Sequence, residues 1–135
     1  MNFDKPFSKE GYLLMGAAFA VHRELGGGLL EEIYQEALEL ELKFQRIPFE
    51  PKEELTVFYK DTALKKRYIP DLVVCGEIMV ELKAVSEFAP EHEAQILNYM
   101  RITQKPVGYL INFAPIKEVG WKRYVLSEFL TADRR

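Results

Sequence analysis

Two charged residues lie within the otherwise apolar segment 78–85, which reads Ile-Met-Val-Glu-Leu-Lys-Ala-Val. Because the segment is rich in β-branched residues, we expect it to form a strand. Alternation along a strand places Glu81 and Lys83 on the same face. An ionised carboxylate in apolar surroundings needs a partner or a metal ion. The pair is therefore either a salt bridge on a solvated face or part of a polar site.

Asp71 favours a polar site. It follows Pro70 near the start of the preceding predicted strand, residues 68–74, and the chain is expected to turn at residues 75–77. A turn with an odd number of residues, such as a type I turn with Gly76 in the left-handed conformation, pairs odd-numbered residues with odd-numbered residues. Asp71 would then share a face with Glu81 and Lys83. A two-residue turn would place Asp71 on the opposite face.

Two carboxylates on one face, with an ammonium group beside them, make a site of hard oxygen ligands, which suits Mg²⁺ or Mn²⁺. The backbone carbonyl of Leu82 is a candidate for a further ligand. Such a site suits phosphodiester hydrolysis, because the metal polarises the phosphate and lowers the pKa of a bound water. Lys83 would orient that water or stabilise negative charge in the transition state.

Glu31 is a further candidate acidic residue. At 100° per residue it lies within about 20° of Leu38 and Leu42 around its predicted helix, with Tyr34 one turn on, so its carboxylate projects toward the apolar side. The alternative is that Glu31 only stabilises the start of the helix, where the helix dipole favours negative charge. The spacing leaves both interpretations open.

A polar stripe is expected on the helix that begins near Pro90, because His92, Gln95 and Tyr99 follow one another at steps of three and four residues. Such a stripe is also typical of an ordinary hydrogen-bonded helix surface. A single histidine in this context is more often structural than a ligand. The stripe therefore supports a site near this helix without identifying its chemistry.

Helical spacing predicts three helices, over residues 8–25, from near Leu30 to before Pro48, and over residues 90–102, with a break between the first two at the glycines of residues 26–28. Alternation and β-branched composition predict strands over residues 55–59, 68–74, 78–85 and 107–113, with a further strand near Trp121 and Tyr124. We expect the first three strands to form an antiparallel meander. The apolar stripe of the second helix is expected at Ile33, Ala37, Leu40 and Phe44.

The strand, helix, strand order at residues 78–113 implies a parallel, right-handed crossover.

The chain of 135 residues is long enough for one domain, and its 48% hydrophobic residues exclude global disorder. With 18 basic and 21 acidic residues, the net charge of −3 excludes a protein that coats nucleic acid through overall positive charge. Contacts with phosphates must be local. The candidates are Lys65, Lys66, Arg67, Arg101, Lys105, Lys122 and Arg123, although such charges are often only a solvated surface.

Cys75 is the single cysteine, so the chain cannot form an internal disulfide, and the composition fits a reducing cytoplasm. With only two histidines, no zinc-binding set of Cys and His is present. The apolar stretch at residues 12–21 ends in small residues, as a signal peptide does. The charges before it cancel, however, and it is too short to cross a bilayer, so we expect a cytoplasmic protein with no membrane contact.

The segment Ile69-Pro70-Asp71, followed after nine residues by Glu81-Leu82-Lys83, resembles the PD-(D/E)xK signature of restriction-endonuclease-like nucleases. Residues 28–34, Gly-Leu-Leu-Glu-Glu-Ile-Tyr, are similar to the motif of the GxxExxY family, a small bacterial branch of that superfamily. Gln95 and Tyr99 resemble the QxxxY motif of RecB-type nucleases. The resemblance covers about residues 21–113.

The resemblance implies an α/β (α+β) fold with a restriction-endonuclease-like core, in the order α-β-β-β-α-β, whose central mixed sheet is flanked by helices. It implies a single nuclease-like domain over residues 1–135. By the same resemblance Asp71 and Glu81 would be metal ligands and Lys83 the catalytic lysine. Glu31 would be an additional acidic residue near the metal, and Gln95 and Tyr99 would position the substrate.

Two functions are consistent with these features. The first is a nuclease that requires Mg²⁺ or Mn²⁺ and hydrolyses phosphodiester bonds of DNA. The second is a catalytically silent, nuclease-like module that binds nucleic acid or a protein partner. Metal-dependent cleavage would separate them, whereas DNA binding alone would not. Cleavage of both strands would need two active sites, which a homodimer would supply.

Overall fold

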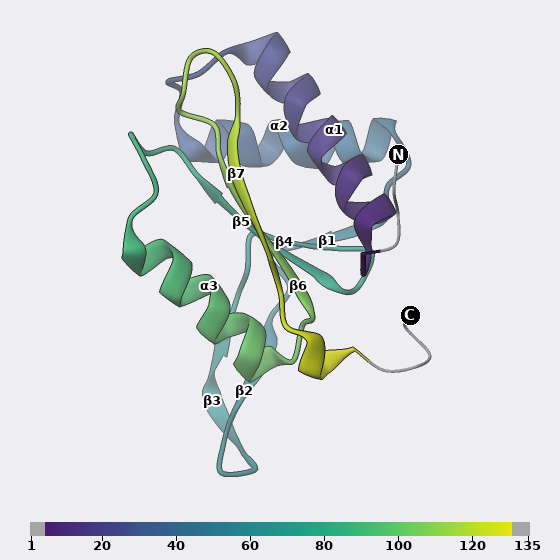
Figure 1. Cartoon of the computed structure of the whole chain (residues 1–135), viewed down its shortest axis with the longest axis vertical. Helices are drawn as coiled ribbons and strands as arrows, with labels where there is room; N and C mark the ends of the chain where they lie inside the picture. The colour runs from purple at the N-terminus through teal and green to yellow at the C-terminus, as the bar shows by residue number, and fades with distance from the viewer. Residues whose placement is uncertain (1–4, 131–135) are drawn as a thin grey trace.

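The computed structural model describes residues 5–130 (Figure 1). This part of the chain contains three α-helices, seven strands and a short 3₁₀ helix at Ser127–Phe129. The helices are α1 (Ser8–Leu25), α2 (Glu31–Phe44) and α3 (Pro90–Thr103). The strands are β1 (Phe49–Pro51), β2 (Leu55–Tyr59), β3 (Thr62–Tyr68), β4 (Leu72–Val74), β5 (Ile78–Lys83), β6 (Val107–Asn112) and β7 (Gly120–Val125).

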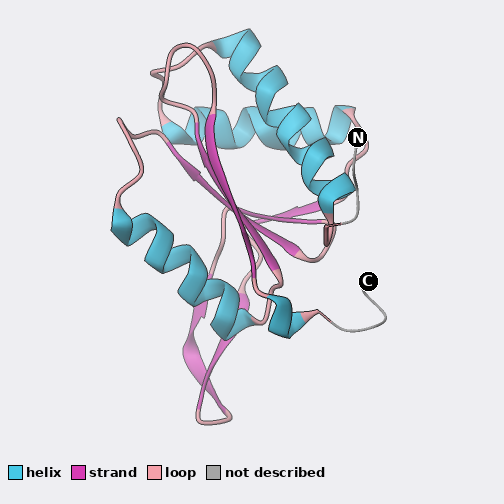
Figure 2. Cartoon of the chain, viewed as in Figure 1, coloured by secondary structure: helices cyan, strands magenta, loops and turns pink. Residues whose placement is uncertain are grey.

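Five strands form a mixed sheet in the order β1-β4-β5-β6-β7, with β5 in the centre. The β5–β6 pair is parallel, as the crossover through α3 predicts, and the other neighbours are antiparallel. The strand expected near Trp121 and Tyr124 is confirmed as β7. Helices α1 and α2 cover one face of the sheet and α3 covers the other (Figures 1 and 2). The sequence thus predicted the fold class correctly.

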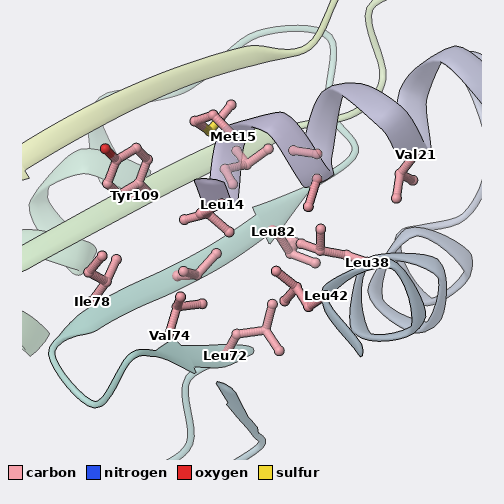
Figure 3. Packing of buried hydrophobic residues seen from close by; sticks show 14 of the residues in the cluster. Leu14, Met15, Val21, Leu38, Leu42, Leu72, Val74, Ile78, Leu82 and Tyr109 are labelled. Atoms are coloured by element: carbon pink, nitrogen blue, oxygen red, sulfur yellow. The ribbon is translucent and has the colours of Figure 1, made fainter. Parts of the chain in front are cut away.

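Alternation along β5 divides its side chains between two apolar clusters. Even-numbered Ile78 and Leu82 pack with residues of α1 and α2, among them Leu14 and Leu38 (Figure 3). Odd-numbered Met79 belongs instead to the cluster on the α3 side, with Ile96, Met100 and Leu110. Glu81 and Lys83 share the odd-numbered face of Met79, so the strand directs both charges toward the side of the sheet that α3 covers.

The three-stranded meander predicted from residue 55 onward is wrong. Strand β2 pairs only with β3, and these two form a separate two-stranded sheet (Figure 2). The single strand expected over residues 68–74 is divided at Ile69 and Pro70, because a proline has no N–H for a sheet ladder. The place beside β4 is taken by β1, a strand that the sequence analysis missed.

The buried side of α2 also differs from the prediction. Ile33, Leu40 and Phe44 are 42%, 50% and 69% exposed, whereas the neighbouring stripe Tyr34, Leu38 and Leu42 is fully buried. Two interactions favour the second stripe. The Tyr34 hydroxyl donates a hydrogen bond to the carbonyl of Gly26 (2.6 Å), and its ring stacks on Phe113 at 4.7 Å.

Between residues 5 and 130, none of the helices combines the length and the apolar character that a membrane crossing requires.

Candidate active site

The β4–β5 hairpin has the register that the site requires. Leu72 pairs with Val80 and Val74 pairs with Ile78, so three residues, 75–77, form the turn. The predicted odd count is confirmed, and it places Asp71 on the face of Glu81 and Lys83. The expected turn type is not found, because Cys75 as well as Gly76 has a positive φ, at 53° and 75°. The parity of the turn, and not its type, fixes the face.

Asp71 is half-buried, and both of its carboxylate oxygens accept hydrogen bonds. Oδ2 accepts from the backbone N–H of Leu82 at 2.7 Å, and Oδ1 accepts from Nζ of Lys52 at 2.8 Å. Its backbone carbonyl accepts from the Lys52 N–H and from Nε2 of Gln35. Asp71 is therefore tied to β5, to the end of β1 and to α2.

The backbone of Leu82 faces the same carboxylate. The carbonyl of Lys83 accepts from the N–H of Phe113 on the β6 side. Because successive residues of a strand direct their N–H and C=O groups to opposite sides, those of Leu82 point toward Asp71. Continuing the β4–β5 register would place Pro70 opposite Leu82, and a proline has no N–H to donate. Within residues 5–130, the register therefore offers the Leu82 carbonyl no ladder N–H from that side, which makes this carbonyl a candidate oxygen ligand.

Glu81 is half-buried, as Asp71 is. Its carboxylate accepts a short hydrogen bond from the hydroxyl of Tyr68. Burial, together with the negative charge of Asp71, raises the pKa of Glu81 to about 7, although Tyr68 and Lys83 act in the opposite direction. The two carboxylates thus repel each other in a partly desolvated site. A bound cation would reduce this repulsion.

Tyr68 is a site residue that the sequence analysis missed. Its ring stacks on that of Tyr99 in α3, with 3.6 Å between the ring centroids. Burial and the charge of Glu81 raise its pKa well above the ordinary value, so the hydroxyl keeps its proton and donates. The structure thereby brings Tyr99 to the site. Gln95 is exposed one turn earlier on α3, where it lines a shallow pocket with Glu91, Ala94, Asn98 and Tyr99.

Glu31 is the first residue of α2 and is exposed. Leu38 and Leu42, which lie on the same side of this helix, are buried. Partial desolvation and the charge of Asp71 raise the pKa of Glu31, and Lys83 lowers it. Glu31 is therefore within electrostatic reach of the hairpin charges. It reaches them from the end of its helix and not from the buried face that the spacing predicted.

Lys83 is half-buried. Its charge lowers the pKa of both Glu31 and Glu81. Within residues 5–130 its ammonium group makes no hydrogen bond or ion pair, so its donors are available to a substrate.

Lys52 and Gln35 are further residues at the site that the sequence analysis missed. Lys52 follows β1, whose last residue, Pro51, pairs with Leu72, so the ladder sets Lys52 beside Asp71. Sequence spacing gave no sign of this contact, because it depends on a strand that was not predicted. The Lys52 ammonium is the cation that balances Asp71 in this structure.

The donor set suits a hard divalent cation, although its present arrangement does not enclose one. In the part of the chain that the structure describes, no three His, Cys, Asp or Glu side chains are grouped closely enough to hold a metal ion. Hard cations nevertheless prefer oxygen ligands, such as the carboxylates of Asp71 and Glu81 and the carbonyl of Leu82. Burial, and after it the negative charge of Asp71, raises the pKa of Glu81.

The basic rim expected around the site does not form one surface. Lys122 pairs with Glu93 at 3.2 Å. Arg123 donates to the Tyr109 hydroxyl and to the carbonyl of Pro6, on the side of the sheet that α1 covers. The basic residues of β3 remain exposed.

The titration of Glu81 predicts how the stability of the metal-free protein depends on pH. Its pKa of about 7 in the folded state lies above the ordinary 4.5, so the folded state binds the proton more tightly. The free energy of unfolding should therefore fall by on the order of 2 kcal/mol between pH 5 and pH 8. Urea denaturation at several pH values measures this change. Glu81→Gln should remove most of it, and an equal pH dependence in both proteins would contradict the assignment.

The mixed five-stranded sheet with helices on both faces is consistent with a restriction-endonuclease-like fold. The sequence model described as the PD-(D/E)XK nuclease superfamily matches residues 8–124, and the chain belongs to this superfamily. Membership indicates nuclease-like chemistry, and members generally use divalent metal ions.

Among solved structures, the chain is similar to the crystal structure of SSO0001, with a TM-score of 0.54 and 18% sequence identity. The match covers 70% of this chain and 48% of that one, so this chain aligns with about half of the other's length. At this identity the likeness supports the fold. No curated protein matches the chain.

Proposed function

We propose that this protein is a nuclease that requires Mg²⁺ or Mn²⁺ and hydrolyses phosphodiester bonds of DNA. The observation that carries the proposal is the hairpin register, which sets Asp71 and Glu81 on one face with Lys83 beside them. Membership in the nuclease superfamily supports the same chemistry.

Asp71, Glu81 and the carbonyl of Leu82 would hold the metal, and Glu31 would reach it directly or through a water. When bound, the ion polarises the phosphate and lowers the pKa of a coordinated water. Lys83 orients the attacking water or stabilises the charge that develops on the phosphate oxygens. Lys52, which donates to Oδ1 of Asp71, would compete with the ion for this carboxylate.

Residues of β3 and α3 would support this chemistry from the side. Tyr68 fixes the carboxylate of Glu81 by its hydrogen bond, which limits the rotation of a metal ligand. Tyr99 holds Tyr68 by stacking. Gln95, exposed one turn before Tyr99, would position the substrate.

We also propose the finer features that the sequence resemblance implies. Residues 28–34 would place the chain in the GxxExxY branch, and residues 1–135 would form one nuclease-like domain. A homodimer would supply the two sites needed for cleavage of both strands. The competing function is a silent module that binds nucleic acid or a protein without cutting it.

A cleavage assay with the purified chain tests the proposed function. Single-stranded DNA, duplex DNA and RNA of the same sequence would be incubated with Mg²⁺, with Mn²⁺ or with a chelator. We expect cleavage of DNA that depends on the metal and disappears with the chelator. Intact substrates under every metal condition would leave the silent module as the better description.

A further inference from the structure

The hairpin of β2 and β3, residues 55–68, carries a local charge opposite to that of the whole chain. We call this hairpin the arm. It holds four basic residues and one acidic residue, whereas the chain as a whole has 18 basic and 21 acidic residues. In Figure 1 the arm extends beyond α3, away from the end of the molecule where α1 meets α2. The basic residues are Lys60, Lys65, Lys66 and Arg67.

The cations of the arm are accessible on both of its faces. Thr62 to Arg67 are all exposed. Alternation directs Lys65 and Arg67 to one face and Lys66 to the other. No carboxylate pairs with Lys65 or Lys66 within the described range 5–130. Near the tip, Phe58 and Tyr59 are 56% and 62% exposed. A strand that only covered the protein core would bury one of its faces.

The base of the arm is held firmly at the candidate active site. An isolated two-stranded sheet is only marginally stable in water. Here Tyr68 stacks on Tyr99 and donates to Glu81, so the arm begins at one of the candidate metal ligands. Arg67 donates to Thr56 across the two strands at 2.6 Å. The arm is therefore positioned relative to the site.

We infer that the arm is a nucleic-acid-binding element that enters a groove of duplex DNA and contacts the phosphates on both sides of it. The inference rests on the proposed function for the nature of its ligand. The major groove of B-DNA is about 12 Å wide and admits a two-stranded β-ribbon. A ribbon in a groove has a phosphate backbone on each side, which matches cations on both faces.

The length of the arm sets the extent of this contact. Seven residues of β3 at about 3.3 Å each span roughly 23 Å. At 3.4 Å per base pair, the arm would reach phosphates about six or seven base pairs from the site. The affinity for duplex DNA should therefore rise with duplex length up to about six or seven base pairs and then level off. A longer duplex adds only more equivalent positions at which the protein can bind.

The test compares two double variants with the same change in net charge. Lys65→Glu with Lys66→Glu alters the arm, and Lys9→Glu with Lys43→Glu alters exposed lysines of α1 and α2. Binding of the full chain to a labelled 20-base-pair duplex would be measured by fluorescence anisotropy without divalent metal, at several KCl concentrations. Thermal melts would show whether each variant is folded.

We expect the arm variant to lose about 10- to 100-fold in affinity, with a salt slope smaller by about two, and the control to lose less than about threefold. If the arm variant unfolds, Lys65→Gln with Lys66→Gln would be compared with Lys9→Gln with Lys43→Gln in the same way.

Equal losses in the two double variants would overturn the inference, and so would wild-type binding to single-stranded DNA or to RNA as tight as to duplex DNA. A wild type that binds no nucleic acid would overturn it as well. The result is independent of cleavage. A protein that binds through the arm but never cuts refutes only the proposed hydrolysis, whereas a cutting protein whose arm variant binds normally refutes only the arm.

Discussion

Lys83→Ala is expected to lower the rate of DNA cleavage by roughly 10²- to 10³-fold, while the affinities for metal and DNA change by less than about threefold. The ammonium of Lys83 makes no hydrogen bond or ion pair within residues 5–130, so its removal leaves no buried partner unsatisfied. Its interaction matters chiefly in the transition state, where negative charge develops. The loss should therefore appear in kcat. Single-turnover kinetics at saturating metal, with binding measured separately, would separate these quantities.

Lys43→Ala is a matched control, because Lys43 is an exposed lysine near the end of α2 and distant in sequence from the hairpin. Its cleavage rate should equal that of the wild type. Gln95→Ala should have an intermediate effect, with weaker substrate positioning and a smaller loss of rate. Cleavage by Lys83→Ala at the wild-type rate would rule out a catalytic role for Lys83.

Asp71→Asn is expected to abolish both cleavage and the stabilisation of the fold by divalent metal. A ligand that binds the folded state raises the melting temperature, and at a concentration of 100 times Kd it adds about 2.7 kcal/mol. Wild-type protein should thus melt at a higher temperature in millimolar Mn²⁺ or Mg²⁺ than in a chelator. The amide removes one negative charge from the pair with Glu81, so the attraction for the ion is lost.

Asp61→Asn makes the same chemical change at the exposed turn of the arm. This control should keep the full increase in melting temperature. A wild type whose melting temperature is unchanged by both ions would argue against a working metal site, whatever the variants do. An Asp71→Asn protein that is stabilised as strongly as the wild type would show that the ion binds elsewhere.

The hairpin at the centre of the site was predictable because its information is local. The spacing from Asp71 to Glu81 and the parity of the turn decide which side chains share a face, and both can be counted along the chain. The helices and the parallel crossover were predictable for a related reason. Long periodic segments retain their type even when their ends shift by a residue or two.

The missed features depend on pairing between distant segments. Strand β1 is three residues long and contains Pro51, so no alternation marks it. Without β1, the contact between Lys52 and Asp71 could not be foreseen. The contact between Tyr68 and Glu81 depends on the break at Pro70, which turns β3 out of the main sheet. In α2, two apolar stripes had similar periodicity, and the interactions of Tyr34 with Gly26 and Phe113 selected the buried one.

The hairpin also bears on the order in which the site is assembled during folding. Asp71, Glu81 and Lys83 lie close in sequence, so their strands can meet with a small loss of chain entropy. The parallel pairing of Ile78 with Val107 must wait for α3 to cross over, and such long-range pairing forms slowly. We therefore expect the two carboxylates to meet while still hydrated and to become buried late in folding. A metal ion held by both carboxylates in the folded state would then slow unfolding more than it accelerates folding.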